Sequence, residues 1–131
     1  MNDEAEITVD MIDHVRIVRV SGEFDADEAD TAARRLAVPS ERSAPSERSA
    51  VATVVDLSRV TFADSSLLHS LLTARQHHER AGLPFVLAEA SPLVLRLLEL
   101  TDTARAFTLA ASLPDAVELV RAHGGGRSRT S

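Results

Sequence analysis

The residues best suited to chemistry in this chain are Asp64, Ser65 and Ser66, which stand together at the start of a predicted helix. Asp64 directly precedes a run whose apolar positions 67, 68, 71 and 72 repeat at helical spacing, so we predict that it is the N-cap. Ser65 and Ser66 then occupy the first turn, where backbone N–H groups lack intrahelical partners and the helix dipole leaves partial positive charge. Two hydroxyl groups therefore lie at a helix end that favours anions.

These residues alone are open to two interpretations. The Asp-Ser-Ser sequence can be capping chemistry and nothing more. Alternatively, His69 follows Ser66 by three residues, so the two can be read with Asp64 as the triad of a small serine hydrolase. One helical turn is poor geometry for a triad, and no Gly-x-Ser-x-Gly motif surrounds the serine, which disfavours hydrolysis.

The pattern before this motif predicts a hairpin, a helix and an insertion. Residues 7–12 and 15–20 read as antiparallel strands, the second with one buried side and ended by Gly22, and residues 28–37 form a helix with acids in its first turn. Residues 39–50 repeat Pro-Ser-Glu-Arg-Ser-Ala twice. This polar, Pro-punctuated segment has no large apolar side chain to offset its ordering entropy, so we predict a flexible insertion.

A central strand leads into the Asp-Ser-Ser motif. Residues 53–55 are β-branched and predict a strand buried on both faces, which Asp56 closes. Val60 and Phe62 alternate with polar residues across a short connection to the helix, and Gly82 ends that helix as its C′ residue.

The rest of the chain continues the alternation of strands and helices. Ser91 and Pro92 are a predicted N-cap and first helical residue, Ser112 or Asp115 caps the last helix, and residues 124–131 are a predicted disordered tail. The predicted elements between the central helix and this last helix are a strand at 83–88, a helix through 100 and a strand at 106–109.

Length and composition set the fold class. With 131 residues, 44% of them hydrophobic, the chain predicts a single α/β domain over residues 1–123, in the order β-β-α-β-α-β-α-β-α. We expect a mixed sheet of about five strands packed with about four helices.

Composition also excludes several classes of function. The net charge of −6 disfavours a nucleic-acid surface, since acids outnumber bases 20 to 14. The sequence has no cysteine, and adjacent His77 and His78 project about 100° apart on a helix, so we expect both on the surface and predict neither a metal site nor a cofactor. No long apolar run or signal peptide is evident, which favours a cytoplasmic protein without membrane contact.

Three motifs in this order resemble the STAS domain of bacterial anti-sigma factor antagonists and anion transporter tails. They are Gly-Glu-Phe-Asp at 22–25, Asp-Leu-Ser-x-Val-x-Phe at 56–62 and Asp-Ser-Ser at 64–66. The resemblance covers residues 7 to about 122 and departs at Leu67, where the family usually has glycine.

This resemblance implies an anti-sigma factor antagonist that regulates sigma-factor-dependent transcription. Its partner is an anti-sigma factor serine kinase that phosphorylates the second serine of the motif, here Ser66, with a serine phosphatase as a further partner. It implies a switch, not an enzyme; the alternative is an unphosphorylated adaptor or scaffold in a signalling or transport complex. The oligomeric state stays open. The residues that we expect to contact the partner are Asp25, Phe62, Asp64, Ser65, Ser66, Leu67 and Leu68.

Overall fold

The computed structural model, which describes residues 5–41 and 43–130, is an α/β domain with a mixed five-stranded sheet, as the sequence predicts. Its strands are β1 (Glu6–Ile12), β2 (Val15–Phe24), β3 (Ala52–Ala63), β4 (Phe85–Ala88) and β5 (Thr108–Ala110). Its helices are α1 (Ala29–Leu36), α2 (Pro45–Arg48), α3 (Ser65–Ala81), α4 (Pro92–Leu100) and α5 (Leu113–Thr130), with 3-10 turns at Ala26–Glu28 and Ala104–Ala106.

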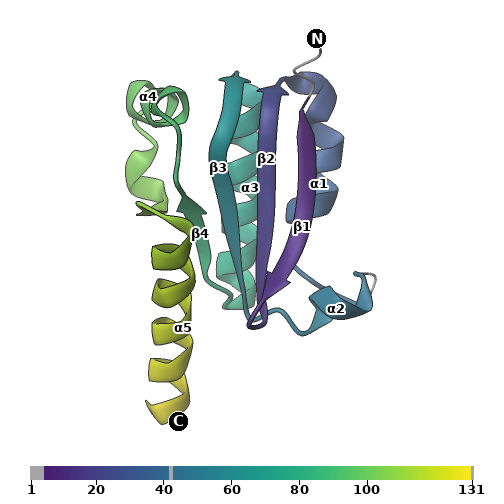
Figure 1. The fold of residues 1–131 in the computed structure, drawn as a ribbon, viewed down its shortest axis with the longest axis vertical. Helices are drawn as coiled ribbons and strands as arrows, with labels where there is room; N and C mark the ends of the chain where they lie inside the picture. Colours follow the sequence, from purple (N-terminus) through teal and green to yellow (C-terminus); the bar gives the residue numbers. More distant parts are fainter. Residues whose placement is uncertain (1–4, 42, 131) are drawn as a thin grey trace.

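The strands lie in sequence order across the sheet. β1 pairs antiparallel with β2, and β2 to β5 are parallel, so the carboxyl ends of β2 and β3 meet at the upper edge in Figure 1. Helices α1, α3 and α4 contribute side chains to one core cluster, and α5 contributes to a second cluster on the opposite face. Both faces of the central strands are therefore covered, which is typical of parallel sheets.

This double coverage corrects the prediction that β2 buries only one side. Val18 and Val20 pack into the larger cluster, whereas Val15 and Ile17 pack against α5. All four are buried, because helices from both halves of the chain close over the strand.

The two central strands are also longer than predicted. β3 does not end at Asp56 but runs to Ala63, and Gly22 lies inside β2 with a φ of 82°. The β2–β3 register shifts twice along this extension, and Asp56 accepts a hydrogen bond from the N–H of Ser58 at 2.9 Å. Polar residues that interrupt the apolar pattern of the strand are accommodated by these register shifts, as in β-bulges.

The predicted ends of α3 and α4 are confirmed. Asp64 accepts a hydrogen bond at the start of α3, and Gly82 ends that helix in the left-handed conformation with a φ of 73°. Ser91 accepts a hydrogen bond from the N–H of Val94 at 3.4 Å, with Pro92 in the first turn of α4. Local capping chemistry therefore fixes where both helices begin.

Two segments that were predicted to lack regular structure contain helix. Residues 45–48 of the insertion form the single turn α2, in which Glu47 pairs with Arg16 at 3.3 Å. Helix α5 continues to Thr130, through residues 124–130 of the segment predicted as a disordered tail, and Ser131 lies outside the described residues. Buried residues anchor the first turns of α5.

A polar cluster of Arg16, Thr53 and His78 is buried at the lower edge of the sheet, opposite the Asp-Ser-Ser motif. The hydroxyl of Thr53 lies 2.9 Å from His78 Nε2 and accepts hydrogen bonds from the Arg16 guanidinium at 3.1 and 3.3 Å. His78 Nδ1 lies 2.8 Å from the carbonyl oxygen of Ala74, which can only accept, so Nδ1 carries the proton and Nε2 is free to accept from Thr53.

The buried position of His78 corrects the prediction that both adjacent histidines lie on the surface. His77 is exposed, but His78 is fully buried, with its ring centroid 4.9 Å from that of Phe85. The spacing of Leu71, Ala74 and His78 along α3 is the signal that identifies it as a core position.

We expect Leu67→Ala to lower the free energy of unfolding by about 2–5 kcal/mol, because Leu67 is fully buried in the larger cluster and its truncation leaves a cavity. Leu100→Ala is the matched control, since Leu100 is 74% exposed and its loss should change stability by less than about 0.5 kcal/mol. Urea denaturation measures both. Equal losses in the two variants would contradict the assigned position of Leu67.

Stability should also fall in mild acid because of His78. Burial lowers the pKa of His78 from 6.5 to about 4, so between these values the unfolded chain binds the extra proton. The stabilisation from the neutral ring is complete above about pH 6.5 and is lost as the pH falls toward 4, by up to about 3 kcal/mol. Denaturant titrations from pH 7 to 4.5 should show a shallower pH slope for His78→Gln than for His77→Gln; identical slopes would refute the assignment.

Candidate functional site

The candidate site lies where β2 and β3 end side by side. Phe24 of β2 and Ala63 of β3 are partners in the parallel ladder, so the residues that follow them, Asp25 and Asp64, leave neighbouring strands at the same edge. Neighbouring strands lie about 4.8 Å apart. The register therefore brings together two motifs that are almost forty positions apart in the sequence.

Asp64 holds the first turn of α3. Its Oδ1 accepts a hydrogen bond from the N–H of Ser66 at 2.8 Å, and its carbonyl oxygen accepts one from the N–H of Leu67 at 3.2 Å. The side chain of Ser65 is exposed and that of Ser66 is half-buried. Within the described residues, neither serine hydroxyl has a hydrogen-bond partner. Both are thus available for modification or binding.

Asp25 holds the neighbouring loop in the same way. Its Oδ1 accepts a hydrogen bond from the N–H of Asp27 at 2.9 Å, and its carbonyl oxygen accepts one from the N–H of Glu28 at 3.0 Å. The first turn of α3 itself carries no acidic residue. The site therefore combines two capping carboxylates at the strand ends with two neutral hydroxyls on a positive helix end.

Phe62 provides an apolar element beside these polar groups. It is 49% exposed, whereas the other three phenylalanines are buried. In the parallel ladder it pairs with Glu23, one residue before the pair at which the two strands end. Phe62 therefore places exposed apolar area next to the polar groups of the motif.

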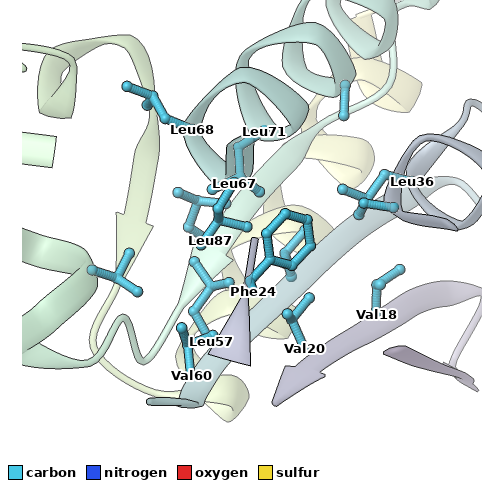
Figure 2. Packing of buried hydrophobic residues seen from close by; sticks show 14 of the residues in the cluster. Val18, Val20, Phe24, Leu36, Leu57, Val60, Leu67, Leu68, Leu71 and Leu87 are labelled. Atoms are coloured by element: carbon cyan, nitrogen blue, oxygen red, sulfur yellow. The ribbon is translucent and has the colours of Figure 1, made fainter. Parts of the chain in front are cut away.

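Leu67 and Leu68 do not belong to this surface, which corrects their assignment as partner contacts. Leu67 is fully buried among Phe24, Leu71 and Leu87 (Figure 2), and Leu68 is 9% exposed in the same cluster. Helical periodicity turns both side chains toward the sheet. The side chain that replaces the usual glycine thus points into the core and leaves the surface around Ser66 uncovered.

The hydrolase triad is not assembled. His69 is exposed, and no hydrogen bond joins it to Ser66 in the part of the chain that the structure describes. The described residues also contain no group of three potential metal ligands and no helix long and apolar enough to cross a membrane.

One candidate contact residue was not anticipated from the sequence. Leu93, in the first turn of α4, is 37% exposed. The hydroxyl of Ser91, just before this helix, donates to the carbonyl oxygen of Val60 at 3.4 Å, so α4 begins beside the end of β3. The sequence signal for an exposed leucine here is the number of leucines in α4, which is more than a single buried helix face can accommodate.

Comparisons with known proteins agree with this fold. An anti-sigma factor antagonist from Mycobacterium paratuberculosis is 27% identical, with a TM-score of 0.72 over 92% of this chain and 97% of that one. The Bacillus cell fate determinant SpoIIAA in its phosphorylated form is 16% identical, with a TM-score of 0.65 over 88% of this chain and 99% of that one. A sulfate transporter family protein from Wolinella succinogenes is 16% identical, with a TM-score of 0.68 over 86% of this chain and 88% of that one.

A search of curated proteins finds no match to this sequence. The family model of the STAS domain, however, matches residues 6–116, which include the five strands of the described sheet, the motifs at 22–25, 56–62 and 64–66, and the start of α5. On this match over most of its length, together with the fold and the strand-end site, the chain belongs to the STAS domain family.

Proposed function

We propose that this protein is an anti-sigma factor antagonist in the cytoplasm that binds a kinase-type anti-sigma factor and is released when Ser66 is phosphorylated. The observation that carries the proposal is the half-buried, unpartnered Ser66 hydroxyl in the first turn of α3, held in place by the Asp64 cap. The similarity to anti-sigma factor antagonists of the same fold supports it.

The docking surface that we propose surrounds the upper end of α3. Phe62 supplies an exposed aromatic ring, and Leu93 adds exposed apolar area at the start of α4. Asp25, Asp64 and Ser65 contribute polar groups at the rim. An apolar centre with a polar rim is the usual anatomy of a protein interface, and aromatic residues often contribute most of its binding energy.

Phosphorylation changes the charge of this surface without requiring a new fold. The Ser66 oxygen attacks the γ-phosphorus of ATP held by the kinase, which releases ADP and passes the hydroxyl proton to a base of the kinase or to solvent. The phosphate adds about −1.5 to −2 charges beside Asp64, which already caps the same turn. A partner surface that accepts a neutral hydroxyl then meets a solvated dianion, whose burial is costly.

The folded domain tolerates the same group. The phosphate lies at the N-terminal end of the 17-residue helix α3, where a negative charge contributes about 0.3–1 kcal/mol of stabilisation. Reversing partner occupancy from 99:1 to 1:99 needs about 5.5 kcal/mol of differential binding. The switch therefore acts on the complex and not on the fold, and a serine phosphatase resets it by hydrolysing the phosphate.

A second candidate is an adaptor that is never phosphorylated. The similarity to a sulfate transporter family protein favours it, whereas the buried Leu67 side chain does not distinguish the two candidates. The same apolar surface then serves constant binding in a signalling or transport assembly. In neither case do we propose catalysis, because Ser66 and His69 lack a triad arrangement among the described residues.

The first test is phosphate transfer. Incubation with ATP and the cognate kinase should add one phosphate by intact mass, mapped by fragmentation to Ser66. Ser65→Ala is the matched control and should still be modified, whereas Ser66→Ala should not. An active kinase that leaves the wild-type mass unchanged would refute the switch and favour the adaptor.

The second test is partner binding. Ser66→Asp should weaken the complex with the anti-sigma factor by at least about tenfold, because it buries a carboxylate at the interface. Ser66→Ala should bind within about twofold of the wild type, and Phe62→Ala should bind more weakly at unchanged stability, since truncating an interface aromatic commonly costs over about 1 kcal/mol. Isothermal titration calorimetry measures all three; equal affinity of Ser66→Asp and Ser66→Ala would exclude charge-based release.

A further inference from the structure

A cationic cavity lies at the lower edge of the sheet, at the end of α1 and far from the Asp-Ser-Ser motif. It has a volume of about 580 Å³ and lies between the last turn of α1 and the insertion that contains α2. Figure 1 shows α2 beside the lower end of α1 and of the central strands. Among the described residues, three arginines, Arg16, Arg34 and Arg35, line this cavity together with Ser43 and a single carboxylate, that of Glu47.

This concentration of positive charge runs against the net charge of the chain, which is −6. Arg34 makes only a hydrogen bond to the Thr31 hydroxyl at 3.4 Å, and Arg35 makes no ion pair within the described residues. Among the described residues, neither of these two lining arginines is therefore paired with a carboxylate. Arginines that face one cavity and lack acidic partners are typical of sites for phosphate groups.

Arg16 forms the floor of the cavity and is 1% exposed. Its guanidinium donates to the Thr53 hydroxyl at 3.1 Å and to the Leu36 carbonyl oxygen at 3.4 Å, which are both neutral groups. The one anion that it meets in the described part of the chain is Glu47, through a single contact of 3.3 Å. Burial lowers the pKa of Arg16, and the Glu47 carboxylate opposes this by stabilising the charged form.

The anchor of Glu47 is weak. Glu47 belongs to a one-turn helix with no buried residues, in a polar insertion. A helix of one turn has little stability of its own, so the pairing with Arg16 depends on a segment that can move away at small cost. Another anion can therefore replace Glu47 without disturbing the core, provided that it neutralises Arg16.

We propose that this cavity binds a phosphate group, for which the Glu47 carboxylate is the stand-in when no ligand is bound. The ligand places its phosphate between Arg16 and the guanidinium groups of Arg34 and Arg35, and the Ser43 hydroxyl lies at the same wall to donate a further hydrogen bond. Glu47 leaves as the phosphate enters, because both need the same guanidinium. Binding thus releases α2 from the body of the domain.

The experiment is calorimetric titration of the full chain with inorganic phosphate and with a mononucleotide, at constant ionic strength set by chloride. The double variant Arg34→Gln/Arg35→Gln should bind at least about tenfold more weakly, as expected from losing one charge-assisted hydrogen bond. The matched control is Arg96→Gln/Arg105→Gln, which removes two exposed arginines elsewhere and should leave affinity unchanged. Both arginines of the first pair are exposed, so the fold should persist, as circular dichroism can verify.

Glu47→Gln separates a ligand site from a purely structural pair. If Glu47 competes with the ligand, this variant should bind phosphate more tightly than the wild type, and weaker or unchanged binding would overturn the proposal. Equal losses of affinity in the two double variants would also overturn it. So would the absence of binding above the chloride background. Tighter binding of the mononucleotide identifies a phosphate ester as the ligand, and equal binding identifies free phosphate. Ser66→Ala should not alter any of these affinities, so failure here leaves the partner switch untouched.

Discussion

The parallel pairing of β2 with β3 is the constraint on which the rest of the molecule depends. Both strands are buried on both faces, and their register sets the upper edge of the sheet by placing Phe24 opposite Ala63. Asp25 and Asp64 follow at once, and each becomes a cap for the segment that begins there. A slip of one residue in this ladder would exchange the side chains of the two core clusters and shift the two caps relative to each other. The site is thus a product of strand registry more than of any local sequence.

Helix α3 has a polar region at each end, one open to solvent and the other buried. At one end Asp64 and Ser66 present acceptors and hydroxyls to solvent, and at the other end His78 is sealed inside with Arg16 and Thr53. Ser66 and His78 are twelve positions apart, which corresponds to about 18 Å along the helix. The two ends of the helix are therefore separated by the packed core and share no direct contact among the described residues.

The features that depend on short-range chemistry were predictable from the sequence. Asp64 and Gly82 as helix ends and the five-stranded mixed sheet follow from capping preference and apolar period. The full length of β3 was not predictable, because its polar residues Asp56, Ser58 and Arg59 resemble a break unless the pairing with β2 is known. Leu67 was assigned to the surface on its nearness to Ser66, whereas burial follows helical phase and not sequence distance. The Glu47–Arg16 pair joins residues 31 positions apart, and no local sequence pattern predicts it.

The two identical copies in the insertion allow one copy to be lost by replication slippage. Only the second copy, residues 45–50, contributes its glutamate to Arg16, while Glu41 of the first copy is exposed. Because the two copies are identical, loss of either one yields the same protein, with a single glutamate in an insertion that is six residues shorter. The shortened loop differs little in closure entropy. Any in-frame contraction to one copy therefore retains a glutamate in the insertion, whichever copy is lost.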